Sequence, residues 1–243
     1  MSNPVFSESV FERAGYSSGT DSMTVNGSIM KTFILGLVFA LTSFVVIKYL
    51  PNFYGSIDGV ITASAIAAFV VGLIIAFKPT TAPVLSVVYA VLESIVVTVI
   101  SILLNQQYNS IVFEAVTYTM IAFFTMLILY RLGIIKATAR FKSVIITATA
   151  AIAISYIILF ILSFFNIRPE WFYGNSTLSI GINAVIIVVA ALNLILDFDF
   201  IEEGASNNMP KYMEWYAAFG LMVTIIWLYI EILRILSKLK SRN

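Results

Sequence analysis

Long uninterrupted runs of apolar residues dominate the chain, and short polar stretches separate them. Four of these runs carry no Asp, Glu, Lys or Arg: residues 59–77, 94–113, 143–167 and 171–196. A helix needs about 20 apolar residues to cross the hydrocarbon layer of a bilayer. When segments with one tolerated charge are included, the pattern predicts seven membrane-spanning helices, at about residues 31–49, 59–77, 83–104, 111–131, 142–166, 178–201 and 212–237. Uniformly apolar runs of this length do not fit the alternating strands of an outer-membrane barrel, which are about ten residues long.

The polar stretches between the runs are short, so consecutive helices are expected to be antiparallel neighbours. Residues 1–30 differ from the rest, because they are polar and rich in Ser, Gly and Thr. They lack the basic start and short apolar stretch of a secretory signal. The expected organisation is therefore a polar N-terminal tail, residues 1–30, followed by an all-α, seven-helix transmembrane domain, residues 31–243.

Composition supports a membrane protein and narrows its chemistry. Hydrophobic residues make up 60% of the 243 positions and charged residues only 11%, which is less than half the charge of a typical soluble domain. The chain has no Cys and no His, so thiolate chemistry and the usual general base are excluded. The net charge of +1 gives no basic surface for nucleic acid. We therefore expect no enzymatic activity and no cofactor, and the sequence identifies no metal site.

The distribution of Lys and Arg predicts the orientation in the membrane. Four of these residues lie in the connection between the fourth and fifth helices, at Arg131, Lys136, Arg140 and Lys142. With the N-terminus in the cytoplasm, they and four others lie inside, and six lie outside. The sequence thus favours a cytoplasmic N-terminus, although the basic C-terminal tail favours the opposite orientation.

Acidic residues inside a bilayer cost about 2.5–3.5 kcal/mol each at its centre, so they mark candidate sites. Glu93 lies at the middle of the third span, and it is read either as a proton or cation site or as a protonated acid that joins two helices. Asp197 shares a polar, small-residue stripe of the sixth span with Asn183, Ala190 and Asn193, so it should face the bundle interior. Asp199 is about 200° further round the helix and should point elsewhere.

Two more acids belong to the seventh span. Glu231 shares a face of small and polar residues with Met213, Ala217, Gly220 and Thr224. Such a face suits a central helix, because small residues let helix backbones approach closely. Glu231 is read either as part of a proton or cation gate or as one member of a salt bridge with Arg234 or Lys238. Glu214, at the start of the span, is expected to be a solvated or interfacial charge.

Four stretches of the sequence resemble one known family. They are MTVNGSIMKT (23–32), YAVLESI (89–95), LNLILDFDFIEEG (192–204) and PKYMEWYAAFGLMVTIIWLYIEILRIL (210–236). They are similar to the bacterial, YccA-like branch of the Bax-inhibitor membrane family. The resemblance implies seven helices, six of them around a central seventh, in the bacterial plasma (inner) membrane. It also implies a pH-sensitive calcium leak, and for bacterial relatives a role in membrane protein quality control.

The family's leak is attributed to two aspartates, on the sixth and seventh helices, that share a proton. The sixth-helix motif maps onto Asp197 and Ile201. Aligning the seventh helix on Leu233–Leu236 places the second aspartate at Thr224, the register we favour, whereas aligning it on Leu228–Ile230 places it at Glu231. Possible partners of Asp197 are then Glu214, Lys211 and Glu93, and Lys78 lies near the family's bridging basic residue.

Two hypotheses about function follow from the sequence. The first is a cation (calcium) leak of the plasma membrane that is gated by protonation of intramembrane carboxylates, with transient Ca²⁺ and protons as its ligands. Calcium prefers oxygen ligands, which carboxylates and backbone carbonyls supply. The second is a non-conducting regulatory protein that binds a membrane protease or another membrane partner.

Overall fold

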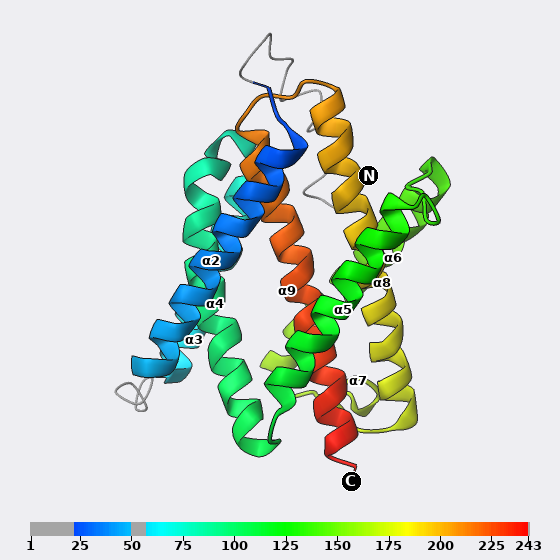
Figure 1. The fold of residues 1–243 in the computed structure, drawn as a ribbon. Helices are drawn as coiled ribbons and strands as arrows, with labels where there is room; N and C mark the ends of the chain where they lie inside the picture. The colour runs from blue at the N-terminus through cyan, green and yellow to red at the C-terminus, as the bar shows by residue number, and fades with distance from the viewer. Residues whose placement is uncertain (1–21, 50–56, 243) are drawn as a thin grey trace. The chain divides into compact units, whose positions relative to one another are not determined.

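The computed structural model describes residues 22–49 and 57–242, and nearly all of them are helical. The elements are α2 (Val25–Tyr49), α3 (Ile57–Phe77), the 3-10 turn η2 (Pro79–Thr81), α4 (Ala82–Gln107), α5 (Ile111–Arg131), α6 (Ala139–Phe164), α7 (Glu170–Tyr173), α8 (Thr177–Ser206) and α9 (Met213–Lys240). Seven of these helices are long and apolar enough to cross a membrane, and no strand occurs among the described residues. The all-α, seven-span prediction is therefore confirmed (Figure 1).

The start of the first helix differs most from the sequence prediction. Helix α2 begins at Val25 instead of residue 31, because Thr24 caps it: the Thr24 Oγ1 accepts a hydrogen bond from the Gly27 N–H at 2.9 Å. Lys31 lies inside this helix, with its Nζ 5.3 Å from the ring centre of Trp215. The last six residues of the expected tail, 25–30, are thus helical, and residues 1–21 lie outside the described part.

The helices form two compact units. One unit comprises Gln107–Phe198 and Thr224–Asn243, and we call it the α5–α8 unit. The other comprises Asp199–Val223 and the described residues up to Gln106, and we call it the α2–α4 unit. Helices α8 and α9 are each divided between the two units, α8 after Phe198 and α9 after Val223.

In the α2–α4 unit, the first part of α9 packs against the helices that precede it. The ring of Phe219 in α9 meets that of Tyr89 in α4 edge to face, with centroids 4.9 Å apart. Gly72 of α3 lies against both rings, and Thr98 of α4 donates a hydrogen bond to Ser43 of α2 at 2.8 Å. These contacts place α3 and α4 around this part of α9 and join α2 to α4.

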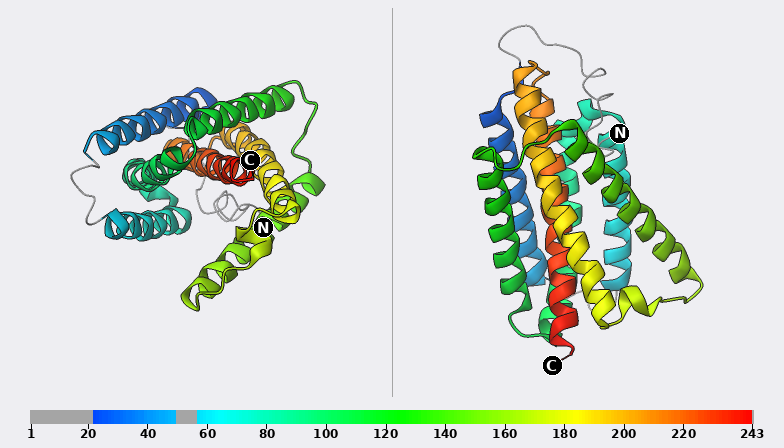
Figure 2. Two further views of the ribbon diagram at one scale, coloured as in Figure 1. Left: turned by 90° about the horizontal axis from the view of Figure 1, so that it is seen from below. Right: turned by 90° about the vertical axis from the view of Figure 1, so that its right-hand side faces the viewer.

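In the α5–α8 unit, the one-turn helix α7 joins the ends of α6 and α8 (Figure 2). Its Phe172 side chain is buried in an apolar cluster with Leu159 of α6 and Ile186 of α8, and Trp227 of α9 packs against them. The sequence predicts only a loop here, because four residues are too few to show a helical period.

Burial differs strongly between the spans. In α9, half of the residues in its most apolar stretch are buried, whereas in α2 only 6% of the corresponding residues are. Large side chains such as Phe33 and Phe69 are exposed on the outer faces. Because the spans are apolar all round, these faces suit lipid contact, and the buried α9 fits the expected central helix.

Candidate functional site: buried carboxylates

Helix α8 buries one polar stripe, as its spacing predicts. Asn183, Asn193 and Asp197 are at most 2% exposed, and the intervening Ala190 is fully buried. Asn193 donates hydrogen bonds from Nδ2 to the Thr149 hydroxyl of α6 and to its own helix at the Val189 carbonyl, both at 2.8 Å. Asp199 is only half-buried. The stripe therefore directs Asp197 into the protein interior.

Asp197 is an acid that is fully buried inside the α5–α8 unit. Its side chain is 0% exposed, and neither carboxylate oxygen makes a hydrogen bond within the described part of the chain. Its polar neighbour is the hydroxyl of Thr224 in α9, which is itself buried. Thr224 is the residue that alignment on Leu233–Leu236 places opposite Asp197.

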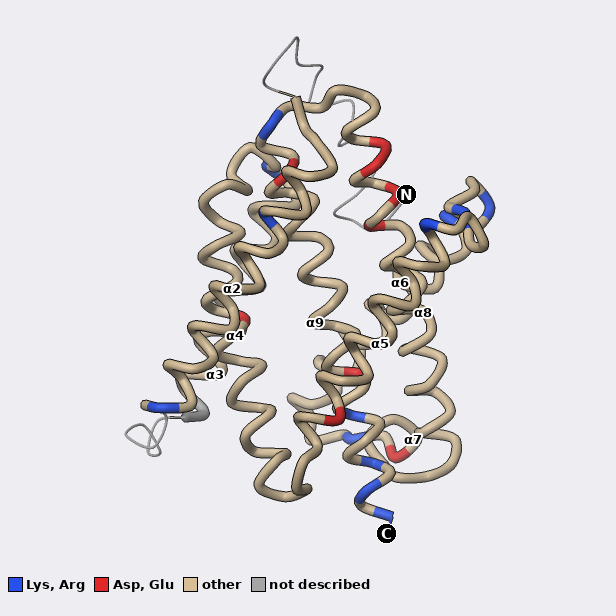
Figure 3. The backbone as a smooth tube through the Cα atoms, viewed as in Figure 1, with Lys and Arg blue, Asp and Glu red and all other residues tan. Residues whose placement is uncertain are grey.

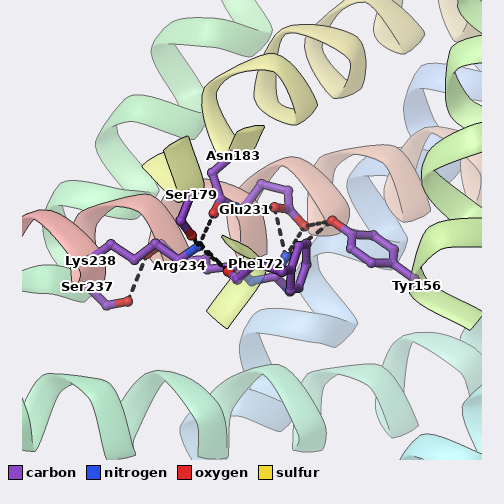
Figure 4. A network of polar contacts seen from close by, with 8 residues as sticks. All are labelled: Tyr156, Phe172, Ser179, Asn183, Glu231, Arg234, Ser237 and Lys238. Carbon is purple, nitrogen blue, oxygen red and sulfur yellow. Dashed lines mark hydrogen bonds and ion pairs between the residues drawn. The ribbon is translucent and has the colours of Figure 1, made fainter. Parts of the chain in front are cut away.

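Glu231 has the opposite surroundings (Figure 4). One carboxylate oxygen accepts hydrogen bonds from the Tyr156 hydroxyl of α6 at 2.5 Å and from Arg234 at 3.0 Å. The other accepts from Asn183 Nδ2 of α8 at 3.0 Å and again from Arg234. Both oxygens are thus satisfied, which is the condition under which a charge can be buried at acceptable cost.

Asn183 also forms a hydrogen bond with a buried lysine, Lys238. Its Oδ1 accepts from Lys238 Nζ, which also donates to the Phe172 carbonyl and the Ser179 hydroxyl, both at 2.6 Å. An ammonium group has three N–H donors, so all the donors of Lys238 are hydrogen-bonded. Arg234 and Lys238 lie over the Phe172 ring at 5.3 and 5.5 Å. We call Tyr156, Phe172, Ser179, Asn183, Glu231, Arg234 and Lys238 the Glu231 network.

Glu214 forms a separate contact in the α2–α4 unit. Its Oε1 accepts hydrogen bonds from the Thr24 backbone N–H at 3.0 Å and the Thr24 hydroxyl at 2.8 Å, and it pairs with Lys211 at 2.8 Å. Its Oε2 is buried and has no hydrogen bond among the described residues. Gly27 lies directly against the carboxylate, and a Cβ there would overlap it.

The prediction that Glu214 is a solvated charge is wrong, because its side chain is fully buried, and the interfacial alternative stays a prediction. The burial follows from local chemistry. Gly27 leaves room for the carboxylate, and Thr24 supplies two donors at the first turn of α2, where unpaired backbone N–H groups and the helix dipole favour an anion.

The remaining candidates are more open. Glu93 is half-buried on the inner face of α4 and makes no hydrogen bond or ion pair with a described residue. Lys78 is exposed next to η2, and residues 22–49 and 57–242 offer it no ion pair. Lys211, in contrast, pairs with Glu214. Of the predicted site residues, the structure therefore joins Asp197 to Thr224 and Lys211 to Glu214.

Several members of the Glu231 network carried no signal in the sequence. Tyr156 and Ser179 are ordinary in an apolar helix, and Phe172 contributes a backbone carbonyl. The Glu231–Arg234 pair at 3.0 Å was anticipated as one alternative, because the residues are three positions apart on a helix. Across the described residues, no group of three or more His, Cys, Asp or Glu side chains could hold a metal ion.

Comparison with known proteins places the chain in one family. The family model described as Bax inhibitor 1 like matches residues 3–241. No curated protein and no solved structure was found to match the chain.

Proposed function

The chain belongs to the Bax inhibitor 1 like family and is a multi-pass membrane protein, and from this premise we propose that it is a pH-sensitive cation leak with Ca²⁺ as the leading ion. Its gate is the protonation of Asp197. We place it in a bacterial plasma membrane, with a cytoplasmic N-terminus and no enzymatic activity.

The observation that carries the proposal is that the buried Asp197 carboxylate makes no hydrogen bond among the described residues and has the Thr224 hydroxyl as its polar neighbour. An ionised carboxylate that is buried without hydrogen bonds costs several kcal/mol, whereas the neutral acid costs far less. Gain or loss of one proton therefore changes the energy of this site more than that of a satisfied acid such as Glu231. That difference is what a proton-driven gate requires.

The mechanism follows from the neighbours of Asp197. When it is protonated, the acid is neutral and α8 and α9 pack closely at Asp197 and Thr224. Loss of the proton leaves a buried anion, which is stabilised only if the packing opens to water or a cation. An arriving Ca²⁺ would meet carboxylate and hydroxyl oxygens, the ligands it prefers. Weak binding of this kind suits passage, because an ion must also leave.

The test is calcium flux in liposomes that contain the purified chain, measured over a range of pH. We expect flux to rise as the pH rises and Asp197 loses its proton. Asp197→Asn keeps a neutral side chain of the same shape, so its flux should stay low and lose its pH response. Asp199→Asn is the matched control, since it removes the same charge from the half-buried side of α8.

Two results would overturn the proposal. If Asp197→Asn keeps both the flux and its pH response, Asp197 is not the gate. If the wild-type chain conducts at no pH, a non-conducting role in binding a membrane partner is favoured instead.

A further inference from the structure

The connection between α5 and α6 concentrates positive charge. Arg131, Lys136, Arg140 and Lys142 fall within twelve positions, and the sequence has no Asp or Glu anywhere from residue 115 to 169. Along the backbone, the basic positions gather where the two helices meet (Figure 3). We call residues 131–142 the basic turn.

The basic turn is a well-ordered structure. Gly133 adopts a left-handed φ of 67°, and its N–H donates to the Tyr130 carbonyl at 2.9 Å. The N–H of Ile134 then donates to the Leu129 carbonyl at 3.0 Å, which closes the end of α5. Thr138 caps the start of α6 by accepting a hydrogen bond from the Phe141 N–H. These hydrogen bonds hold the backbone from which the side chains of the turn project.

Three of the four cations of this turn have no acidic partner among the described residues. Arg131, Lys136 and Arg140 are exposed, and none of them has an ion pair or hydrogen bond with a described side chain. Elsewhere in the same unit two cations do have acidic partners, Lys240 with Glu114 at 2.6 Å and Arg234 with Glu231 at 3.0 Å. The exposed cations of the basic turn thus present positive charge that no acid of the described residues neutralises.

Large apolar side chains are exposed between these cations. Leu132 is 68% exposed and Ile134 is 66% exposed, and Val144 follows one turn into α6. Exposing such a side chain to water forgoes about 1.5–3 kcal/mol of burial energy. The turn lies at the end of two spans, where the acyl chains of a bilayer give way to the phosphate layer.

We propose that the basic turn is a docking surface for anionic phospholipids. Its cations lie at the depth of lipid phosphates, and its exposed Leu and Ile side chains reach the adjoining acyl chains. A negatively charged lipid surface complements both features, because juxtamembrane cations attract anionic headgroups and the apolar side chains are covered by lipid. This interaction is separate from the carboxylate gate and does not depend on it.

Lipid selectivity tests the proposal. The full chain is reconstituted with spin-labelled phosphatidylglycerol or phosphatidylcholine, and the fraction of motionally restricted lipid gives their relative association. The wild type should prefer the anionic lipid, and K136Q/R140Q should reduce that preference by up to about fivefold for each of the two charges at low salt. K48Q/K78Q, which removes two exposed cations elsewhere, should keep it. The proposal fails if both pairs have equal effects or if K136Q/R140Q has none.

The depth of the apolar side chains provides a second measurement. Because the chain has no Cys, Ile134→Cys accepts a single spin label without background. In anionic bilayers, that label should collide with dissolved oxygen more often than with a water-soluble relaxation agent, as should a label at Leu41→Cys on the lipid-exposed face of α2. If the label at position 134 is fully open to the aqueous agent, the turn faces water or a soluble protein, and lipid docking is wrong.

Discussion

Asp197 and Glu231 are both fully buried acids of membrane spans, and they differ in what surrounds them. Glu231 receives donors from α6, α8 and its own helix, whereas Asp197 has a threonine hydroxyl as its neighbour and no hydrogen bond among the described residues. A fully satisfied network rigidifies a structure, and an unsatisfied group stores energy that protonation can release. At the scale of single residues, Glu231 is thus suited to holding helices together and Asp197 to responding to protons.

Replacement of Glu231 should therefore cost stability without changing the gate. Glu231→Gln removes the buried acid of the network and leaves the half-buried Arg234 without its ion-pair partner, a loss that costs up to roughly 3–5 kcal/mol. We expect a clearly lower Tm in detergent, with the pH response of flux retained. Glu114→Gln removes a more exposed pair with Lys240 and should cost at most about 1 kcal/mol. Equal Tm losses for the two variants would contradict the distinction.

Gly27 offers a second test at residue scale. Gly27→Ala places a methyl group on the Glu214 carboxylate, and overpacking of this kind costs typically 1–3 kcal/mol. Gly36 lies in the same helix with nothing within 4 Å of its missing Cβ. Gly36→Ala should therefore be neutral or slightly stabilising, because alanine favours a helix. Thermal unfolding of the two variants checks this, and a Gly27→Ala protein as stable as Gly36→Ala would show that the Glu214 contact is dispensable.

At the scale of elements, the sequence predicted those features that depend on the length and the helical period of apolar segments. The seven spans and the buried stripe of α8 follow from charge-free runs and from spacing at 100° per residue. The burial of Glu214 could not be foreseen, because it depends on a contact between residues 190 positions apart. For the same reason the links from Tyr156 and Phe172 to α9 had no signal in the sequence. The early start of α2 was missed for a different reason, since it rests on the local cap that Thr24 forms with Gly27.

Lys238 is expected to hold α7 in place. Lys238→Met removes the donor to the Phe172 carbonyl and the Ser179 hydroxyl, so amide hydrogens of residues 170–179 should exchange faster. Lys240→Met serves as the matched control. Lys240 contacts the Asn109 carbonyl and Glu114, so its loss should instead accelerate exchange near residues 109–114. If exchange at α7 is unchanged in Lys238→Met, the Phe172 contacts are not what holds it.

At the scale of the whole molecule, four spans separate the N-terminus from the basic turn, so both ends of that segment lie on one side of the membrane. The Lys and Arg distribution predicts that this side is the cytoplasm. A membrane-impermeant thiol reagent should therefore label Lys136→Cys in inverted vesicles but not in intact cells. Labelling in intact cells would reverse the predicted orientation and place the basic turn outside.

The most direct test of the account measures flux and the protonation of Asp197 in the same proteoliposomes. Infrared difference spectra report the carboxylic acid band that is lost in Asp197→Asn, while a calcium dye reports flux at each pH. We predict that loss of this band and the rise of flux share one midpoint, which Asp199→Asn leaves in place. A flux midpoint that is unrelated to the protonation of Asp197, or one that persists in Asp197→Asn, would contradict the account.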